Sequence, residues 1–127
     1  MGQRYLMDTN VVIDFFNATL PEKAKNLLFT IEPIISVISH IELFSSTKIS
    51  DQELFHLQNF IKAATVYDNI NADIVKNTIA IRKAHKIKTP DAIIAATAIV
   101  YDLTLITRNT ADFKNIPNLK IIDPHSF

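Results

Sequence analysis

The sequence contains no cysteine and a single glycine among its 127 residues. Without cysteine there are no disulfides, no thiolate nucleophile and no zinc site built on sulfur, and the absence is consistent with a reducing compartment. An average composition of about 7% glycine would give roughly nine glycines in this length. Phosphate-binding loops of the Walker and dinucleotide types present backbone N–H groups from several glycines, so the sequence excludes both.

Long apolar runs and an excess of charge are also missing. No apolar stretch approaches the roughly 18 residues that cross a bilayer, and the opening MGQRYLMD lacks an apolar signal region. We therefore expect a cytoplasmic protein with no membrane association. Thirteen basic residues balance thirteen acidic ones, so net charge predicts no general attraction to nucleic acid. The 48% hydrophobic content is enough for one core, and we expect a single domain over residues 1–127.

Short apolar segments alternate along the chain with segments of helical periodicity. The predicted strands are RYLMDT (4–9), PIISVI (33–38), TVYD (65–68), LTLIT (103–107) and LKIID (119–123). Between them lie segments long enough and amphipathic enough to form helices. This alternation predicts an α/β fold, a three-layer α/β/α sandwich around a four- to five-stranded, mainly parallel sheet.

Several polar residues stand where the first turn of a helix is expected. Two pairs fit the S-x-x-E capping box, and two further residues can cap later helices. These caps are Ser39 with Glu42, Ser50 with Glu53, Asn71 and Thr89. Pro90 suits a first helical turn, and the body of TPDAIIAATAIVYD (89–102) is apolar on nearly all faces, so we expect this helix to be buried. The segment RNTADF (108–113) is predicted as a polar turn.

Four acidic residues fall where a predicted strand ends or a helix begins: Asp8, Glu42, Asp91 and Asp112. Each alone can be explained as a helix cap or a turn residue. The carboxyl ends of parallel strands share one edge of a sheet, so we expect the four to converge there. Two carboxylates about 5 Å apart repel by roughly 3 kcal/mol at an effective dielectric of about 20, and a shared cation relieves that repulsion. An oxygen-only ligand set favours Mg²⁺ or Mn²⁺.

Small polar residues accompany these acids and can orient them or hold a ligand water. They are Thr9, Asn10, Ser36, Ser39, Thr107 and Asn109. Ordinary strand-end and turn chemistry explains them equally well. Asp14, one to two helical turns beyond Asp8, is expected on the surface. The four histidines, His40, His56, His85 and His125, show no ligand spacing and are expected to be structural or surface residues.

Basic residues gather in RKAHKIK (82–88), just before the third acid, and flank the fourth. A solvated helix end is one explanation, since cations suit a helix carboxyl terminus. The other is a rim that contacts substrate phosphates beside the acidic site. The candidates for that rim are Arg82, Lys86, Lys88, Arg108 and Lys114.

Three segments, in order, resemble the PIN-domain ribonucleases, and within them the short VapC-type toxins of toxin–antitoxin pairs. They are YLMDTNVVIDF (5–15), SVISHIELF (36–44) and TPDAIIAATAIVYDLTLITRNTADF (89–113). The resemblance covers almost the whole chain and places the family's four acids at the positions named above. Asp102 stands where the family often has glycine or asparagine, and LFSSTK (43–48) lacks a frequent glycine.

The resemblance implies an endoribonuclease that depends on Mg²⁺ or Mn²⁺ and cleaves RNA phosphodiester bonds by water attack. Asp8 and Asp91 would be the principal metal ligands, with Glu42 and Asp112 completing the pocket. It further implies a cognate antitoxin that blocks the acidic pocket and contacts DNA on the toxin's behalf. A homodimer is also implied, with DQELFHLQNFIKAA (51–64) and the helix before Lys86 available for the interface.

Two other classes of protein are compatible with acids at strand ends. A haloacid-dehalogenase-like phosphatase requires a second aspartate two residues after the first, where this chain has Asn10. A receiver domain requires a phosphoacceptor and a closing lysine that the middle strands do not supply. The other alternative is a catalytically silent PIN-like scaffold that binds RNA or protein. Its expected mark would be a missing acid, whereas all four are present.

Overall fold

The computed structural model describes residues 3–126, in which short strands alternate with helices. The strands are β1 (Tyr5–Met7), β2 (Ile34–Ser36), β3 (Thr65–Tyr67), β4 (Thr104–Ile106) and β5 (Lys120–Ile122). The helices are α1 (Thr9–Phe16), α2 (Glu22–Thr30), α3 (Val37–Phe44), α4 (Asp51–Ala63), α5 (Ala72–Ala84), α6 (Thr89–Val100) and α7 (Thr110–Phe113). Across these residues, each helix is too short or too polar to span a membrane.

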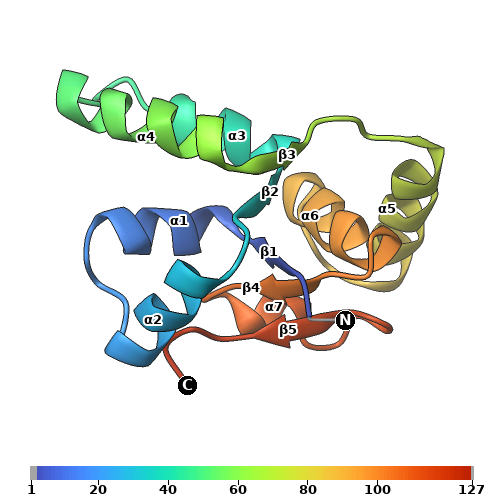
Figure 1. Cartoon of the computed structure of the whole chain (residues 1–127). Coiled ribbons are helices and arrows are strands. Elements are labelled where there is room, and N and C mark those ends of the chain that lie inside the picture. The colour runs from blue at the N-terminus through green and yellow to red at the C-terminus, as the bar shows by residue number, and fades with distance from the viewer. Residues whose placement is uncertain (1–2, 127) are drawn as a thin grey trace.

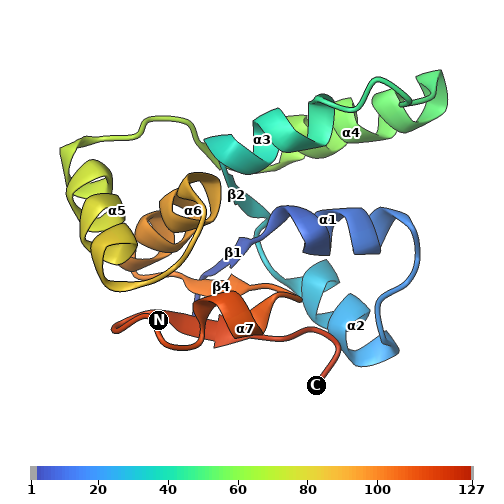
Figure 2. The ribbon, with the colours of Figure 1, turned by 180° about the vertical axis from the view of Figure 1, so that it is seen from behind.

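The strands form two small parallel sheets that lie next to each other. β4 pairs with both β1 and β5, whereas β2 pairs with β3, and β1 lies against β2. Because every pair is parallel, the carboxyl ends of the strands point to one edge. Helices α5 and α6 lie on one side of the strands and α1 and α2 on the other, with α3 and α4 above them in Figure 1; Figure 2 shows the same layers from behind.

Two hydrophobic cores lie on opposite faces of the strands. Successive strand residues point to opposite faces, and each central strand supplies one apolar residue to each core. One core contains Leu6, Ile34 and Leu105, packed against α5, α6 and α7, and the other contains Met7, Ile35 and Ile106, packed against α1 and α3. The predicted three-layer α/β class is therefore confirmed, and the helices contribute most of its residues.

The second strand is shorter than the sequence predicts. PIISVI was predicted as a strand, but Val37 already begins α3, and Ser36 is its N-cap, with its hydroxyl accepting from Ser39 N at 3.3 Å. The predicted capping box of Ser39 with Glu42 is therefore wrong. Ser36 and Ser39 are both possible N-caps by sequence, and the β-branched residues between them favour a strand. In the folded chain these residues instead form the first turn of α3. Ser50 with Glu53 forms the predicted capping box, and Asn71 caps α5 as expected.

In the carboxyl half, the start of α6 and the segment 108–113 differ from the prediction, and the backbone at Asp102 is unusual. Thr89 is the first residue of α6 rather than its cap, because Lys88 occupies the N-cap position without a side-chain bond. The segment predicted as a polar turn contains the short helix α7. Asp102 has a φ of 54°, in the left-handed region where aspartate is tolerated better than most residues other than glycine. This explains how the chain turns into β4 without a glycine at this position.

Candidate active site

Asp8 ends the first strand and is the centre of the acidic edge. It follows Met7, whose register partner is Ile106, so Asp8 and Thr107 leave adjacent strands side by side. The Thr107 hydroxyl donates to Asp8 Oδ2 at 2.8 Å, and Thr9 N donates to Oδ1 at 2.8 Å. Asp8 is also the N-cap of α1, so the capping explanation is correct and accounts for one of its two oxygens.

Asp8 is 5% exposed, and its carboxyl has an elevated pKa. Burial is the main cause, and repulsion from Glu42 adds to it. The hydrogen bonds from Thr107, Thr9 and Asn10 oppose the shift because they stabilise the charged form. Within residues 3–126 the side chains that hydrogen-bond to Asp8 are all neutral. The protein therefore orients this carboxylate without neutralising it.

Glu42 reaches the same edge from α3 and is joined to the first helix through a hydroxyl chain. Thr9 Oγ1 lies 2.6 Å from Glu42 Oε1 and 2.8 Å from Ser39 Oγ. A hydroxyl has one proton, so donation to the carboxylate leaves Ser39 as the donor to Thr9. Ser39 is completely buried, so this row of hydrogen bonds is held in place between α1 and α3. The expected pairing of small polar residues with an acid is present here.

Asp91 lies in the first turn of α6 and is half-buried. Its pKa is elevated, first by burial and then by repulsion from Asp8, Glu42 and Asp112. Three acids from three other parts of the chain thus act electrostatically on this one carboxyl. Only Lys88, at the start of the same helix, acts in the opposite direction. Asp91 is therefore within electrostatic range of the other three acids.

Asp112 comes from α7 and is held by the turn after β4. Asn109 Nδ2 donates to Asp112 Oδ2 at 2.7 Å, while Asn109 N donates to Thr107 Oγ1 at 3.0 Å. The same turn is attached to α1, because Arg108 N donates to Asn10 Oδ1 at 3.2 Å. Thr107 is fully buried, and its hydroxyl donates to Asp8 and accepts from Asn109 N. It therefore connects the Asp8 and Asp112 sides of the acidic edge.

The donor set of this edge suits a hard divalent cation. All four ligand candidates offer carboxylate oxygens, which Mg²⁺ and Mn²⁺ prefer, and a cation would relieve the repulsion around Asp91. In the described part of the chain, no three acidic or histidine side chains lie close enough together to hold an ion as they are positioned. The chemistry of the donors thus fits, while the carboxylates do not form a closed ligand group.

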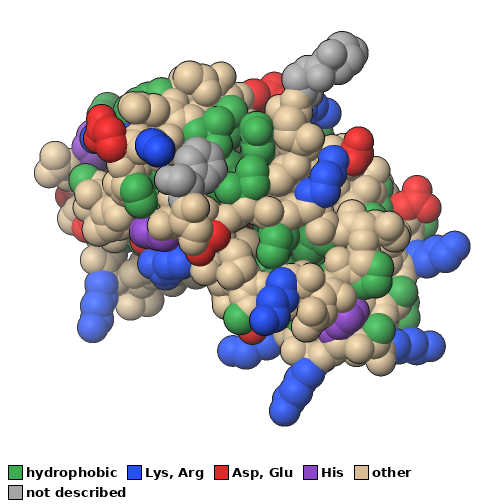
Figure 3. Space-filling model, turned by 90° about the horizontal axis from the view of Figure 1, so that it is seen from below, with side chains coloured by type: hydrophobic (Ala, Val, Ile, Leu, Met, Phe, Trp, Pro, Cys, Tyr) green, Lys and Arg blue, Asp and Glu red, His purple; other side chains and the backbone are tan. Residues whose placement is uncertain are grey.

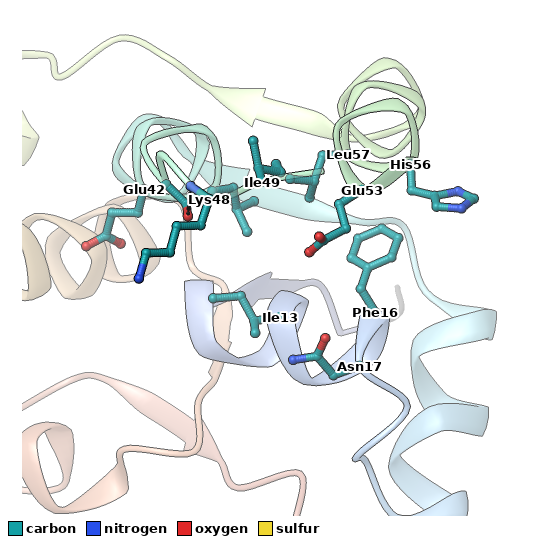
Figure 4. Close-up of a pocket in the computed structure, with 11 residues that line it drawn as sticks. Ile13, Phe16, Asn17, Glu42, Lys48, Ile49, Glu53, His56 and Leu57 are labelled. Atoms are coloured by element: carbon teal, nitrogen blue, oxygen red, sulfur yellow. Dashed lines mark hydrogen bonds between the residues drawn. The ribbon is translucent and has the colours of Figure 1, made fainter. Parts of the chain in front are cut away.

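A cavity of about 330 Å³ opens beside Glu42, between α1 on one side and α3 and α4 on the other. Figure 4 shows Ile13 and Phe16 pointing up from α1 toward Ile49 and Leu57, with Glu42 and Lys48 at one end and His56 at the other. Polar side chains also line the cavity, among them Glu53, which points into the space between the helices (Figure 4). Of the four acids, only Glu42 lines this cavity.

The candidate basic rim consists of exposed residues with different surroundings. Lys88 lies near Asp91, whereas Arg82 Nε donates to Ile87 O at 3.2 Å. Arg108 Nη1 is bonded to Asp14 and so is not directed at the acids. Lys86 and Lys114 are exposed. Seen from below, lysine and arginine side chains project at separate points rather than in one patch (Figure 3).

Asp14 was expected on the surface, and this expectation is wrong. The residue is 5% exposed, and its carboxylate contacts Arg108 Nη1 at 2.9 and 3.1 Å and His125 Nε2 at 3.2 Å. Asp14 lies three residues after the buried Val11, on the same face of α1. That spacing was the signal for its burial. Nothing in the sequence pattern pointed to Arg108 or His125 as its partners, because they lie 94 and 111 residues away.

Fold and site together define a three-layer α/β domain with four acids at the carboxyl edge of parallel strands. The family model of the PIN domain matches residues 5–119, and the chain belongs to this family. A curated relative, Ribonuclease VapC of Rickettsia bellii, is 40% identical over 72 residues, which are 56% of this chain and 49% of that protein. The chain thus matches about half the length of this relative.

Two solved structures extend the likeness over nearly the whole fold. A toxin–antitoxin complex from Klebsiella pneumoniae contains a chain with 34% identity and a TM-score of 0.76, covering 94% of this chain and 97% of that one. VapBC2 from Rickettsia felis, bound to a promoter DNA fragment, contains a chain with 27% identity and a TM-score of 0.78, covering 94% and 98%. The resemblance noted from the sequence is thereby confirmed.

Proposed function

We propose that this protein is a metal-dependent endoribonuclease and the toxin of a type II toxin–antitoxin pair. The observation that carries the proposal is the crowding of Asp91 by three other acids at the carboxyl edge of the strands. Family membership and relatives named as a ribonuclease and as toxin–antitoxin complexes support it. An anionic pocket without an internal counter-charge at Asp8 is suited to bind a cation and, through it, a phosphodiester.

Asp8 and Asp91 are the proposed ligands for Mg²⁺ or Mn²⁺, with Glu42 and Asp112 bordering the same space. A bound ion would lower the pKa of an attacking water and neutralise charge on the phosphoryl oxygens. The chain's own part is to keep the carboxylates ionised and aimed. The Thr107 hydroxyl and the Thr9 backbone amide do this for Asp8, and Asn109 orients Asp112 through a hydrogen bond.

The proposed substrate is RNA, whose phosphates would meet the exposed lysines around the edge. Lys88 is the best placed, because it lies at the start of α6 beside Asp91. Lys86 and Lys114 extend the rim. Arg108 is a weaker candidate for phosphate binding than the sequence suggested, since its guanidinium is paired with Asp14. These contacts would bind RNA without reading its sequence.

A PIN-like scaffold that binds RNA without cleaving it is the second candidate. One observation favours it: within residues 3–126 no three acids form a ready-made metal site. The test that separates the candidates is incubation of a broad RNA panel with the protein and Mn²⁺, with and without EDTA. Fragments that appear only without EDTA support the nuclease. RNA binding without fragments supports the scaffold and contradicts the nuclease.

The matched control in that test is Asp102→Asn. Asp102 is an exposed acid paired with Lys120 at 3.0 Å, and asparagine tolerates its left-handed backbone as well. We expect this variant to cleave at the wild-type rate. Loss of cleavage in Asp102→Asn as well as in site variants would mean that general charge, rather than the acidic edge, governs activity.

An antitoxin and a second copy of the chain are the proposed protein partners. The solved relatives are toxin–antitoxin complexes, which supports the first. For the second, α4 exposes Phe55, and α5 exposes Val75 and Ile79, one helical turn apart. Light scattering of the purified chain would establish whether it is a dimer. Co-purification with the product of the neighbouring gene, and inhibition of cleavage by it, would establish the antitoxin.

A further inference from the structure

Asp14, Arg108 and His125 form a second cluster of ionisable side chains. It joins α1, the turn after β4 and the segment after β5. The Asp14 side chain is 7% exposed, whereas that of Arg108 is 56% exposed and that of His125 is 33% exposed. A buried carboxylate without partners would lower the stability of the fold. Conformations of the chain that keep Arg108 in contact with Asp14 are therefore strongly favoured.

Arg108 lies between the two residues that hold the acids of the site. Its neighbour Thr107 donates to Asp8, and its other neighbour Asn109 donates to Asp112. The Arg108 guanidinium contacts Asp14, while the side chains of Thr107 and Asn109 contact acids of the site. The position of this three-residue turn therefore determines where both hydrogen bonds to the acids can form.

The same turn is attached to α1 at two points. Arg108 N donates to Asn10 Oδ1 at 3.2 Å, and the guanidinium contacts Asp14, one helical turn further along. Asn10 and Asp14 are four residues apart and so lie on one face of the helix. Two attachments restrict rotation of the turn as well as its distance from the helix. Only the second attachment is charged.

We propose that Asp14 is a positioning residue for the acidic site: through Arg108 it holds Thr107 and Asn109 in register with Asp8 and Asp112. This inference rests on the proposed function of that site. His125 Nε2 also contacts Asp14 Oδ2, at 3.2 Å, and within residues 3–126 it forms no hydrogen bond to the turn, so its loss should affect stability more than site geometry. The alternative is that the cluster only stabilises the fold.

The test is a double-mutant cycle of Asp14→Asn and Arg108→Gln, read first in the absence of metal. We expect both single variants to shift the backbone amide NMR signals of residues 107–112 and the side-chain amide signal of Asn109, and to speed their hydrogen exchange. Amides of α5, remote from the cluster, should not move. The effects should be non-additive, because Asp14 acts through Arg108. Arg108→Lys should restore part of the wild-type pattern.

The second readout is Mn²⁺ affinity by calorimetry. We expect about tenfold weaker binding in each single variant, the scale found for partners that orient metal ligands, and unchanged binding in Asp102→Asn. If Asp14→Asn does not fold, Arg108→Gln carries the test, since its side chain is half exposed.

Each outcome decides the matter. A lower melting temperature with unchanged amide signals and Mn²⁺ affinity within twofold of wild type would overturn the positioning role. If wild-type protein binds no Mn²⁺, the proposed metal-dependent function fails. The amide signals of the turn, measured without metal, still establish or overturn the role of Asp14.

Discussion

Asp8 and Asp14 are two carboxylates six residues apart, each 5% exposed, with opposite surroundings. Asp14 contacts the guanidinium of Arg108 and the ring of His125. Asp8 accepts hydrogen bonds only from neutral groups within residues 3–126, and the charged groups acting on it include Glu42. The charge of Asp14 is compensated inside the protein, whereas the charge of Asp8 has no such partner among the described residues and is available to a cation. This difference separates a carboxylate that organises the fold from one suited to hold a cation.

The largest expected effect is on activity, from Asp8→Asn. Removing this charge should lower Mn²⁺-dependent RNA cleavage by at least about 100-fold, because the ion would lose a principal ligand and its stabilisation of phosphoryl charge. The fold should tolerate the change, since asparagine keeps one acceptor oxygen. Cleavage of labelled RNA and thermal denaturation by circular dichroism measure the two. Full activity in a folded Asp8→Asn protein would exclude the proposed site.

The counterpart at the compensated charge is Asp14→Ala, whose main effect should be on stability. Loss of hydrogen bonds to a charged group costs about 1.5–3 kcal/mol, and we expect a decrease of that order in the free energy of unfolding. Urea denaturation followed by circular dichroism measures it. Asp102→Asn, which breaks an exposed ion pair, should cost less than about 1 kcal/mol. Equal losses in the two variants would show that burial of Asp14 has no energetic consequence.

Thr107→Val tests how the protein keeps Asp8 ionised. Burial raises the pKa of Asp8, and the Thr107 hydroxyl lowers it, so the nearly isosteric valine should raise that pKa further. The acidic limb of Mn²⁺ binding should then move to higher pH, with affinity weakened about tenfold at neutral pH. Carbon-13 NMR titration of the Asp8 carboxyl reports the pKa directly. An unchanged titration would mean that the 2.8 Å hydrogen bond is not maintained in solution.

The smallest expected effect is a gain in stability from Asp91→Asn without metal. Burial and three neighbouring acids raise the pKa of Asp91 above its ordinary 3.8, so the folded state binds this proton more tightly than the unfolded state. The free energy of unfolding must then fall as pH rises from the ordinary pKa of 3.8 through the elevated pKa of the folded state. Asparagine does not ionise, so the variant does not lose this stability. We expect the variant to melt a few degrees higher at neutral pH, with the gain vanishing below 3.8.

Thermal denaturation in EDTA across this pH range checks the expectation. Added Mn²⁺ should then stabilise the wild type but not Asp91→Asn, reversing their order. If the variant is no more stable than wild type in EDTA at neutral pH, the carboxylates do not repel one another as the geometry requires.

Local sequence signals predicted the elements that depend on neighbouring residues. The capping box at Ser50, the Asn71 cap and all five strand locations are confirmed, because each depends on hydrogen bonds or alternation within a few residues. The start of α3 was predicted wrongly because Ser36 and Ser39 are both local cap candidates. Packing of Ser39 against Thr9, thirty residues away, accompanies the use of Ser36.

The sequence by itself determined the alternation of strands and helices, and from it came the prediction that Asp8, Glu42, Asp91 and Asp112 converge at one edge. The carboxyl ends of parallel strands lie together, which explains the place of Asp8, whereas Glu42, Asp91 and Asp112 reach the edge from helices. Only the tertiary structure decided which buried acid is compensated, because Arg108 and His125 reach Asp14 across 94 and 111 residues of chain. Local periodicity carries no information about contacts over that distance, and strand register, which places Thr107 beside Asp8, is set by the packing of the whole sheet.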